Sequence, residues 1–366
     1  MLNYWEVPAQ DFIKKELTLY AKENHLSTPK VSVDKLLPLL PSTYAEEVKD
    51  YAPAVKAWLA LQMSKSSSLT YCKSDVLGEF IYDTNMYKVS FNCEALVYVS
   101  DSGLEPVIPY GLRSCKYMFA WNTLPEGFTL GDKFDTSNIE NMESMFNRCK
   151  LPEGFTLGNK FDTSNVKNMY WMFSECILPK GFTLGDKFNT RNVTEMSCMF
   201  NECTLPKGFT LGDKFDTRNV ISMFSMFDKC KLPKGFTLGN KFDTSNVENM
   251  NYMFHECILP EGFTLGNKFD TSKVIRMAGM FNECILPKGF TLGDKFDTRN
   301  AIEMVLMFAL CKFPKDFTLG YKFSIGTDTH MEFMFDKCEL GDEPLKDDPE
   351  ETVQKLGGTV RWLINC

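Results

Sequence analysis

The amino-acid sequence predicts an α/β solenoid, a stack of similar coils that each contain a short strand, a turn and a short helix. A Met-Phe dipeptide recurs nine times at a constant interval of 27 residues, first at residues 118–119 and last at residues 334–335. Eight cysteines, from Cys149 to Cys338, keep the same interval three residues after a Phe. A fixed interval without insertions is typical of units that bury their apolar faces only by stacking on one another.

The first half of each unit is expected to contain the strand. In one unit, Phe155, Thr156 and Leu157 alternate apolar, polar and apolar between two glycines. This alternation suits a short strand with Phe and Leu facing inward and Thr facing outward. Pro152 lies just before this segment and marks the end of the preceding helix, because proline cannot continue a helix.

The second half of each unit is expected to be a helix. Apolar residues recur at the spacing of one buried helix face, at Val166, Met169, Met172, Phe173 and Cys176. The Thr-Ser-Asn tripeptide that precedes them supplies side chains that cap helix N-termini. We therefore expect residues 166–176 and their equivalents to form short helices with one buried face.

Stacking would place equivalent side chains of successive units in rows. Rows of Phe and Leu, together with the Met-Phe dipeptides, are expected to form the core. A row of Asn is expected either to cap the helices or to bridge adjacent coils. Its members are Asn138, Asn165, Asn192, Asn219, Asn246 and Asn300.

The 13 cysteines do not predict a disulfide framework. Side chains that stack in one row are poorly aimed for the narrow geometry of a disulfide, and free Cys is among the most buried residue types. A zinc site needs paired ligands, for which Cys198 and Cys203 are the nearest approach. We interpret the cysteine row as small core residues, expect no metal and no cofactor, and note that many free thiols fit a reducing compartment.

The two ends of the chain depart from the 27-residue interval. Near the N-terminus, helical patterns separated by prolines are followed by short strand patterns, and the tail reads as one helix and a final strand. Such ends are expected to cover the open edges of the stack. The predicted organisation is a helical domain over residues 1–70, a β-rich cap over residues 71–111, the solenoid over residues 112–338 and a C-terminal cap over residues 339–366.

Composition excludes some classes of partner. The formal net charge of −8 gives no basic surface for nucleic acid or for anionic membranes. No apolar run reaches the ~18 residues of a spanning helix, and the N-terminal sequence lacks the pattern of a signal peptide. We therefore expect a soluble chain that binds no nucleic acid and does not insert into a membrane.

The repeated run FDTSNVxNMxxMFxxC, found for instance at residues 161–176 and 242–257, resembles the repeat of BspA-like leucine-rich-repeat proteins, a family of bacterial surface proteins. The resemblance covers about residues 112–338. It implies a right-handed, leucine-rich-repeat-like stack and a role in adhesion or in binding host or neighbouring-cell molecules. It also implies a cell-surface or secreted location, whereas the lack of a signal peptide, lipobox or sorting tail favours the cytoplasm as the alternative.

Positions that do not repeat are the candidate contact residues. The two residues between the helix methionines vary from unit to unit, and they are expected to project sideways or outward from the helix. Aromatic side chains are unusual on a purely solvated face, and those at these positions are predicted to form a partner-binding patch: Tyr170, Trp171, Phe224, Tyr252 and Phe333. The alternative is that the rings pack against neighbouring helices or the caps and serve stability alone.

The sequence offers little support for catalysis. It contains three histidines, His25, His255 and His330, and none of the common catalytic motifs. The tripeptide at residues 255–257, His-Glu-Cys, occupies the same frame as Asn-Glu-Cys in other units, so its Cys is expected in the core and its His as an exposed variant. We therefore expect no catalytic residue.

Three functions remain after these exclusions. The first is a surface or secreted recognition protein of the adhesin kind. The second is an intracellular recognition scaffold or effector whose helical N-terminal domain recruits a partner protein. The third is a structural spacer, which would tolerate changes at the non-repeating positions. In all three the chain is a non-catalytic repeat protein, and its oligomeric state is left open.

Overall fold

The computed structural model describes the repeats continuously and the N-terminal region only in short strands. The described residues are 5–8, 69–74, 78–83, 90–91, 95–96, 98–99, 106–107 and 113–361 without residues 117, 122, 125, 132 and 133. The helices predicted within residues 1–70 lie outside the described residues.

The described strands of the N-terminal region pair antiparallel. β1 (Trp5–Pro8), β2 (Leu69–Ser74) and β3 (Gly78–Asp83) form one sheet in the order β1-β2-β3. Two hairpin-like pairs follow, made by β4 (Ser90–Phe91) with β5 (Ala95–Leu96) and by β6 (Tyr98–Val99) with β7 (Pro106–Val107). Strands therefore lie in the region where the sequence predicts a β-rich cap, and β1 adds a strand that the sequence analysis did not predict.

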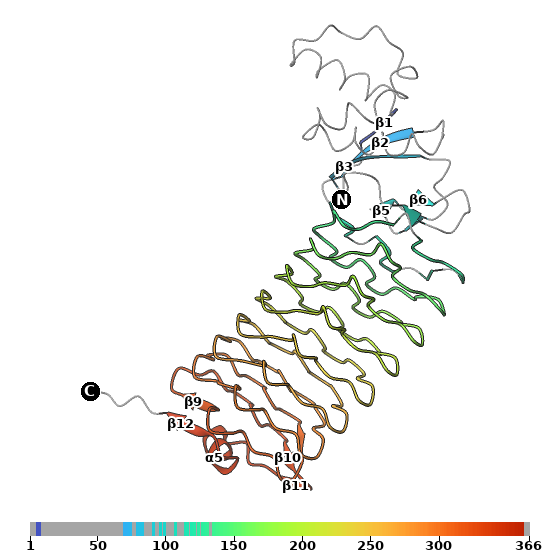
Figure 1. Ribbon diagram of the computed structural model, residues 1–366. Helices are drawn as coiled ribbons and strands as arrows, with labels where there is room; N and C mark the ends of the chain where they lie inside the picture. Colours follow the sequence, from blue (N-terminus) through green and yellow to red (C-terminus); the bar gives the residue numbers. More distant parts are fainter. Residues whose placement is uncertain are drawn as a thin grey trace, which may run out of the picture.

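Successive 27-residue repeats lie side by side in a regular array (Figure 1). Most repeats pair in parallel with the next at two positions, as Asn168 does with Glu195 and Ile177 with Thr204. The first of these two ladders runs without a break from Ser114 to His330. Equivalent residues therefore share one register along the whole array, as the constant interval predicts.

The helices predicted at residues 166–176 and their equivalents are wrong, because this segment is a series of tight turns. The amide of Met172 donates to the carbonyl of Met169 (3.2 Å), whereas the next amide, of Phe173, donates to Met199 in the following repeat (3.0 Å). Trp171 and Glu175 have φ of 57° and 53°, values that a right-handed helix excludes. The apolar spacing identified the buried residues correctly, but bonding between repeats replaces the helical hydrogen bonds.

The strands predicted at residues 155–157 and their equivalents are also wrong. In the equivalent segment Phe209 and Leu211 are buried and Thr210 is exposed, as predicted. The backbone there is not a strand, however, since the amide of Phe209 turns back to the carbonyl of Pro206 (3.0 Å). The parallel ladders lie instead beside the Met-Phe segment.

Three columns of stacked phenyl rings fill the core. In the Met-Phe column, Phe200 and Phe227 stack at 5.8 Å between centroids and 8° between planes. A second column contains Phe209, whose ring meets Phe200 edge-on at 5.8 Å and 73°. The third column contains Phe215, stacked at 6.4 Å on Phe242. Offset stacking and edge-to-face contacts are the favoured geometries of aromatic pairs, so the columns hold both the repeats and the layers within a repeat together.

The repeated Asp-Thr-x-Asn sequence holds neighbouring repeats together through hydrogen bonds. The buried hydroxyl of Thr217 donates to the carbonyl of Asp243 (2.8 Å) and accepts from the Asp243 amide (2.7 Å). The side-chain amide of Asn219 donates to the carbonyl of Arg191 in the preceding repeat (2.7 Å). Of the two roles predicted for the Asn row, bridging adjacent repeats is therefore confirmed.

The cysteine row is buried and free, as predicted. The thiol of Cys203 contacts the carbonyl oxygen of Phe173 in the preceding repeat (2.7 Å), and Cys257 makes the same kind of contact with Phe227 (3.0 Å). Burial raises the pKa of Cys203 to about 12. These thiols therefore act as core side chains with a weak donor and not as nucleophiles.

The C-terminal residues cover the last repeat. β10 (Glu339–Leu340) lies between β8 (Lys312–Phe313), to which it is parallel, and β11 (Glu343–Pro344). A helix follows where the sequence predicts one, and its first turn is capped by a side chain of the preceding Asp. This helix is α5 (Pro349–Lys355), and β12 (Thr359–Arg361) after it pairs in parallel with β9 (Ser324–Gly326).

We predict that Thr217→Val lowers the free energy of unfolding by about 1–3 kcal/mol, because it leaves the partly buried amide and carbonyl of Asp243 without their partner. Thr210→Val makes the same chemical change at an exposed position and is expected to stay within about 0.5 kcal/mol of the parent chain. Denaturant unfolding followed by circular dichroism measures both. Equal stabilities of the two variants would contradict the bridging role of the threonine row.

Candidate functional site

The non-repeating pairs lie in the first turn after the buried methionine that begins each Met-Phe segment. The second residue of each pair adopts a positive φ, for instance 57° at Trp171, 58° at Tyr252 and 57° at Phe333. This conformation is uncommon for residues other than glycine, and here the bonds between repeats on both sides of the turn hold it. The side chains at these positions are therefore fixed by a backbone that is itself the same in every repeat.

The structure does not gather the five predicted contact residues into one patch. Tyr170 and Trp171 stack on each other at 4.5 Å, and Trp171 keeps 38% of its surface exposed. The equivalent pair in the following repeat, Ser197 and Cys198, is small and buried. Phe333, at 59% exposure, lies three repeats beyond Tyr252. The five aromatic side chains therefore lie at three separate locations along the array and do not form a single patch.

Phe224 and Tyr252 do contact each other. A histidine that the sequence analysis did not count among the contact residues lies beside them. The Phe224 and Tyr252 rings meet edge-on at 6.1 Å, and Tyr252 meets the ring of His255 edge-on at 5.5 Å. A Cβ atom at Gly279 would lie 2.3 Å from the Tyr252 ring, so this ring occupies the space that a side chain would take in the next repeat. We call Phe224, Tyr252 and His255 the aromatic cluster.

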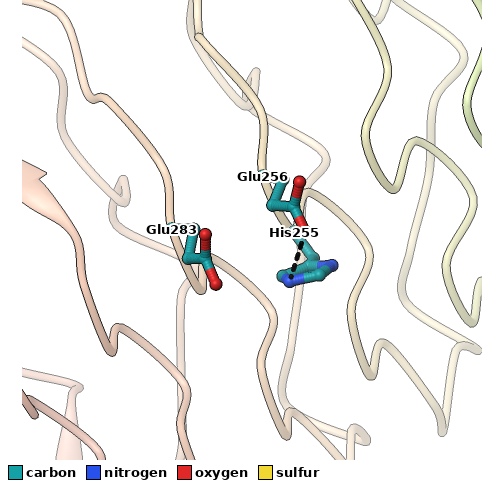
Figure 2. A group of neighbouring side chains, drawn as sticks. All are labelled: His255, Glu256 and Glu283. Atoms are coloured by element: carbon teal, nitrogen blue, oxygen red, sulfur yellow. Dashed lines mark ion pairs between the residues drawn. The ribbon is translucent and has the colours of Figure 1, made fainter.

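Charged groups surround the histidine of this cluster. The Nδ1 atom of His255 lies 2.8 Å from the Asp228 carboxylate, and its Nε2 atom lies 3.5 Å from the Glu256 carboxylate. Glu283, one repeat further on, completes a group of three side chains whose possible ligand atoms lie within 4.8 Å of one another. Figure 2 shows Glu283 on the neighbouring coil beside the His255 ring. Lys229 Nζ is 3.2 Å from the same Glu256 oxygen.

The electrostatic surroundings of His255 stabilise its charged form. Burial opposes that charge, but the hydrogen bond to Asp228 and the negative charges of Asp228 and Glu256 outweigh it and raise the pKa of His255 above its ordinary value. The His255 side chain is only 15% exposed. The expectation that it is an exposed variant is therefore wrong, because the Asp228 carboxylate of the preceding repeat holds the ring against the array.

The sequence did contain a signal for this histidine. Other repeats place a small or acidic residue at its position, such as Ser174, Asn201 and Asp228. Those residues form polar contacts with the next repeat, for instance between the Ser174 hydroxyl and the Asn201 side chain (3.0 Å). A larger ring at that position, one repeat after an Asp, was the clue that it would be held by a carboxylate.

Several surface hollows of the described residues lie elsewhere, between the glycine turns. One of them, between two neighbouring repeats, is lined by Thr210, Gly212, Asp213 and Lys241 among others. Another has the equivalent residues of a later pair of repeats, including Thr291 and Gly293. Because these linings repeat, they supply no position that distinguishes one part of the array from another.

Comparison with known families agrees with the repeat. Three overlapping stretches, residues 113–234, 180–284 and 237–348, match the family described as "Mycoplasma protein of unknown function, DUF285". Together they span most of the chain. The chain belongs to the DUF285 family.

The other comparisons add no relative to this DUF285 protein. No curated protein and no solved structure matches it. Within the part of the chain that the structure describes, no helix has the length and hydrophobicity of a membrane span. The DUF285 array is thus a bacterial repeat protein of unknown function.

We predict that Gly279→Ala in this DUF285 array displaces the Tyr252 ring and lowers the free energy of unfolding by about 1–3 kcal/mol. The new methyl group meets the ring, and a positive φ adds a cost for any residue with a Cβ. In a Tyr252→Ser background only the φ cost remains. A double-mutant cycle by thermal unfolding should therefore give a coupling of about 0.5–3 kcal/mol, and a coupling near zero would show that the ring does not rest on Gly279.

Proposed function

We propose that this DUF285 protein is a non-catalytic recognition scaffold that binds another protein through the turn face bearing the aromatic cluster. Support comes from the contrast between a repeated core and a non-repeated surface. Phe224 and Tyr252 are half-buried rings from adjacent repeats that contact each other, although the equivalent positions in several other repeats carry small residues. Partly buried aromatic side chains surrounded by polar groups are typical anchors of protein interfaces.

The charges near the cluster fit the same role. Acidic groups from three repeats, Asp228, Glu256 and Glu283, lie beside the rings and exceed the basic charge of Lys229. A partner with a basic or amphipathic segment would complement this surface in charge while covering the rings. The absence of known catalytic motifs in the sequence supports a binding role over an enzymatic one.

We also propose that the array is a solenoid of the kind found in BspA-like surface proteins, which would place the protein at the bacterial surface or outside the cell. The parallel pairing of successive repeats and the Phe-Asp-Thr-Ser-Asn-Val motif support this reading. The hand of the stack stays a prediction.

The solenoid proposal makes a prediction about length. Removal of residues 181–261, which correspond to three whole repeats, joins equivalent positions and preserves every kind of contact between repeats. The shortened chain is expected to fold and to lose about 14 Å of its longest dimension, at ~4.8 Å for each parallel pairing. Small-angle X-ray scattering measures the difference, and an unfolded deletion variant or an unchanged length would contradict a linear stack.

The recognition proposal predicts that Phe224→Ser combined with Tyr252→Ser removes a bound partner without unfolding the array. Partners are captured on the immobilised full chain and identified by mass spectrometry, and the dissociation constant of the purified partner is then measured. Loss of two anchor rings is expected to weaken binding by at least 2 kcal/mol, or about 30-fold. Circular dichroism confirms that the variant keeps its fold.

Two further variants locate the contact. Tyr170→Ser with Trp171→Ser tests the separate stacked pair, and Thr210→Val with Thr237→Val is a matched control on the exposed glycine-turn face. A partner lost equally in all three double variants would argue against the aromatic cluster as the contact. Indifference of every captured protein to all three would favour the structural spacer.

A further inference from the structure

We propose that His255, Glu256 and Glu283 bind one divalent transition-metal ion, with zinc as the best match. The three side chains come from two neighbouring repeats, and their possible ligand atoms lie within 4.8 Å of one another (Figure 2). This site shares His255 and the surrounding carboxylates with the proposed recognition surface, but its test does not require a partner.

The distances already approach those of a metal centre. The Nε2 atom of His255 and the Oε1 atom of Glu256 are 3.5 Å apart. Two ligands of a tetrahedral zinc ion, each bound at about 2.0–2.1 Å, lie about 3.4 Å from each other. Glu283 is exposed, and one of its carboxylate oxygens already lies within 4.8 Å of the ligand atoms of the other two residues.

Asp228 prepares the histidine for this role. An ionised carboxylate only accepts hydrogen bonds, so the 2.8 Å contact between Asp228 and Nδ1 places a proton on Nδ1. In the neutral ring the lone pair then lies on Nε2, the nitrogen that faces Glu256. A carboxylate that holds the distal nitrogen of a ligating histidine is the usual second layer of zinc sites, where it fixes both the tautomer and the ring orientation.

The backbone beneath the three ligands is also held in place. The amide of Glu256 donates to Asn282 (2.8 Å) and the amide of Glu283 donates to Ala309 (2.8 Å), each in the following repeat. Both residues share the same positive φ, at 52° for Glu256 and 58° for Glu283. The two glutamates therefore leave equivalent positions of adjacent repeats with the same backbone geometry.

The local charge favours a bound cation. Three carboxylates, of Asp228, Glu256 and Glu283, face one ammonium group, that of Lys229, so two negative charges are left over when the imidazole is neutral. A divalent ion balances them. An imidazole nitrogen combined with carboxylates favours zinc and its neighbours over calcium and magnesium, which prefer oxygen ligands alone.

The array contains its own control for this chemistry. Glu202 occupies the position of Glu256 in an earlier repeat, but Asn201 stands there in place of the histidine and Lys229 in place of the second glutamate. Among the described repeats, the combination of a histidine and two successive glutamates in this frame is found at His255 alone. Asparagine at three equivalent positions, Asn147, Asn201 and Asn282, also shows that the fold accepts asparagine for His255.

The test is isothermal titration of zinc chloride into the chelator-treated full chain, purified without a histidine tag. We expect one ion per chain from this site and at least a 100-fold loss of affinity in His255→Asn, with a similar loss in Glu283→Gln. Asp228→Asn is expected to weaken binding by about 10–100-fold, since it removes only the group that orients the ring. Glu202→Gln, the matched control, is expected to bind zinc as the parent does.

Two further readouts decide between this site and zinc bound elsewhere on the chain. Cobalt substituted for zinc should give visible absorption bands that disappear in His255→Asn. Zinc should raise the thermal unfolding midpoint of the parent and not of that variant, because only an ion that prefers the folded state stabilises it. Lys229→Met should strengthen binding, since it frees Glu256. Zinc affinity that is unchanged in His255→Asn, or no zinc binding by the parent, would overturn the proposal.

Discussion

The fold of this DUF285 protein depends on one constraint, the pairing of each repeat with the next in a single register. Alternate amides of the Met-Phe segment donate to carbonyls 26 residues further on, as Phe173 does to Met199. The same register aligns the phenyl columns, the threonine bridges and the cysteines. A single inserted residue would move all of these groups out of line at once, which explains why the interval of 27 residues is constant from Met118 to Phe335.

The sequence predicted which side chains are buried better than it predicted the conformation of the backbone. Apolar residues at positions 166, 169, 172, 173 and 176 are all buried, as expected of a helix face. A periodic pattern, however, reports only which side chains point inward. The turns at Trp171 and Glu175 bury the same residues that a helix would bury. Their positive φ values could not be predicted from residue type, since Trp, Glu, Ser and Lys all occupy such positions.

The candidate site shows the same limit. Sequence variation between repeats identified Phe224 and Tyr252 as unusual, but it also selected Tyr170, Trp171 and Phe333, which lie in other parts of the array. Which rings meet depends on their neighbours in space, such as Gly279, whose missing side chain makes room for Tyr252. His255 was treated as an isolated exposed residue because the sequence does not show that Asp228, one repeat earlier, lies beside it.

Because the array contains a row of buried thiols, its stability depends on protection of these thiols from oxidation as well as on the free energy of folding. Burial raises the pKa of Cys338, in the last repeat, to about 12. The Cys338 carbonyl accepts a hydrogen bond from the amide of Leu345 in the C-terminal tail (2.8 Å). If that end opens, the thiol returns to water and to an ordinary pKa of about 8.5, where oxidation becomes fast. An oxidised, more polar sulfur would fit poorly into the buried cysteine row. Fraying at the terminus would therefore expose this thiol to oxidation, and the C-terminal residues protect the end of the array against it.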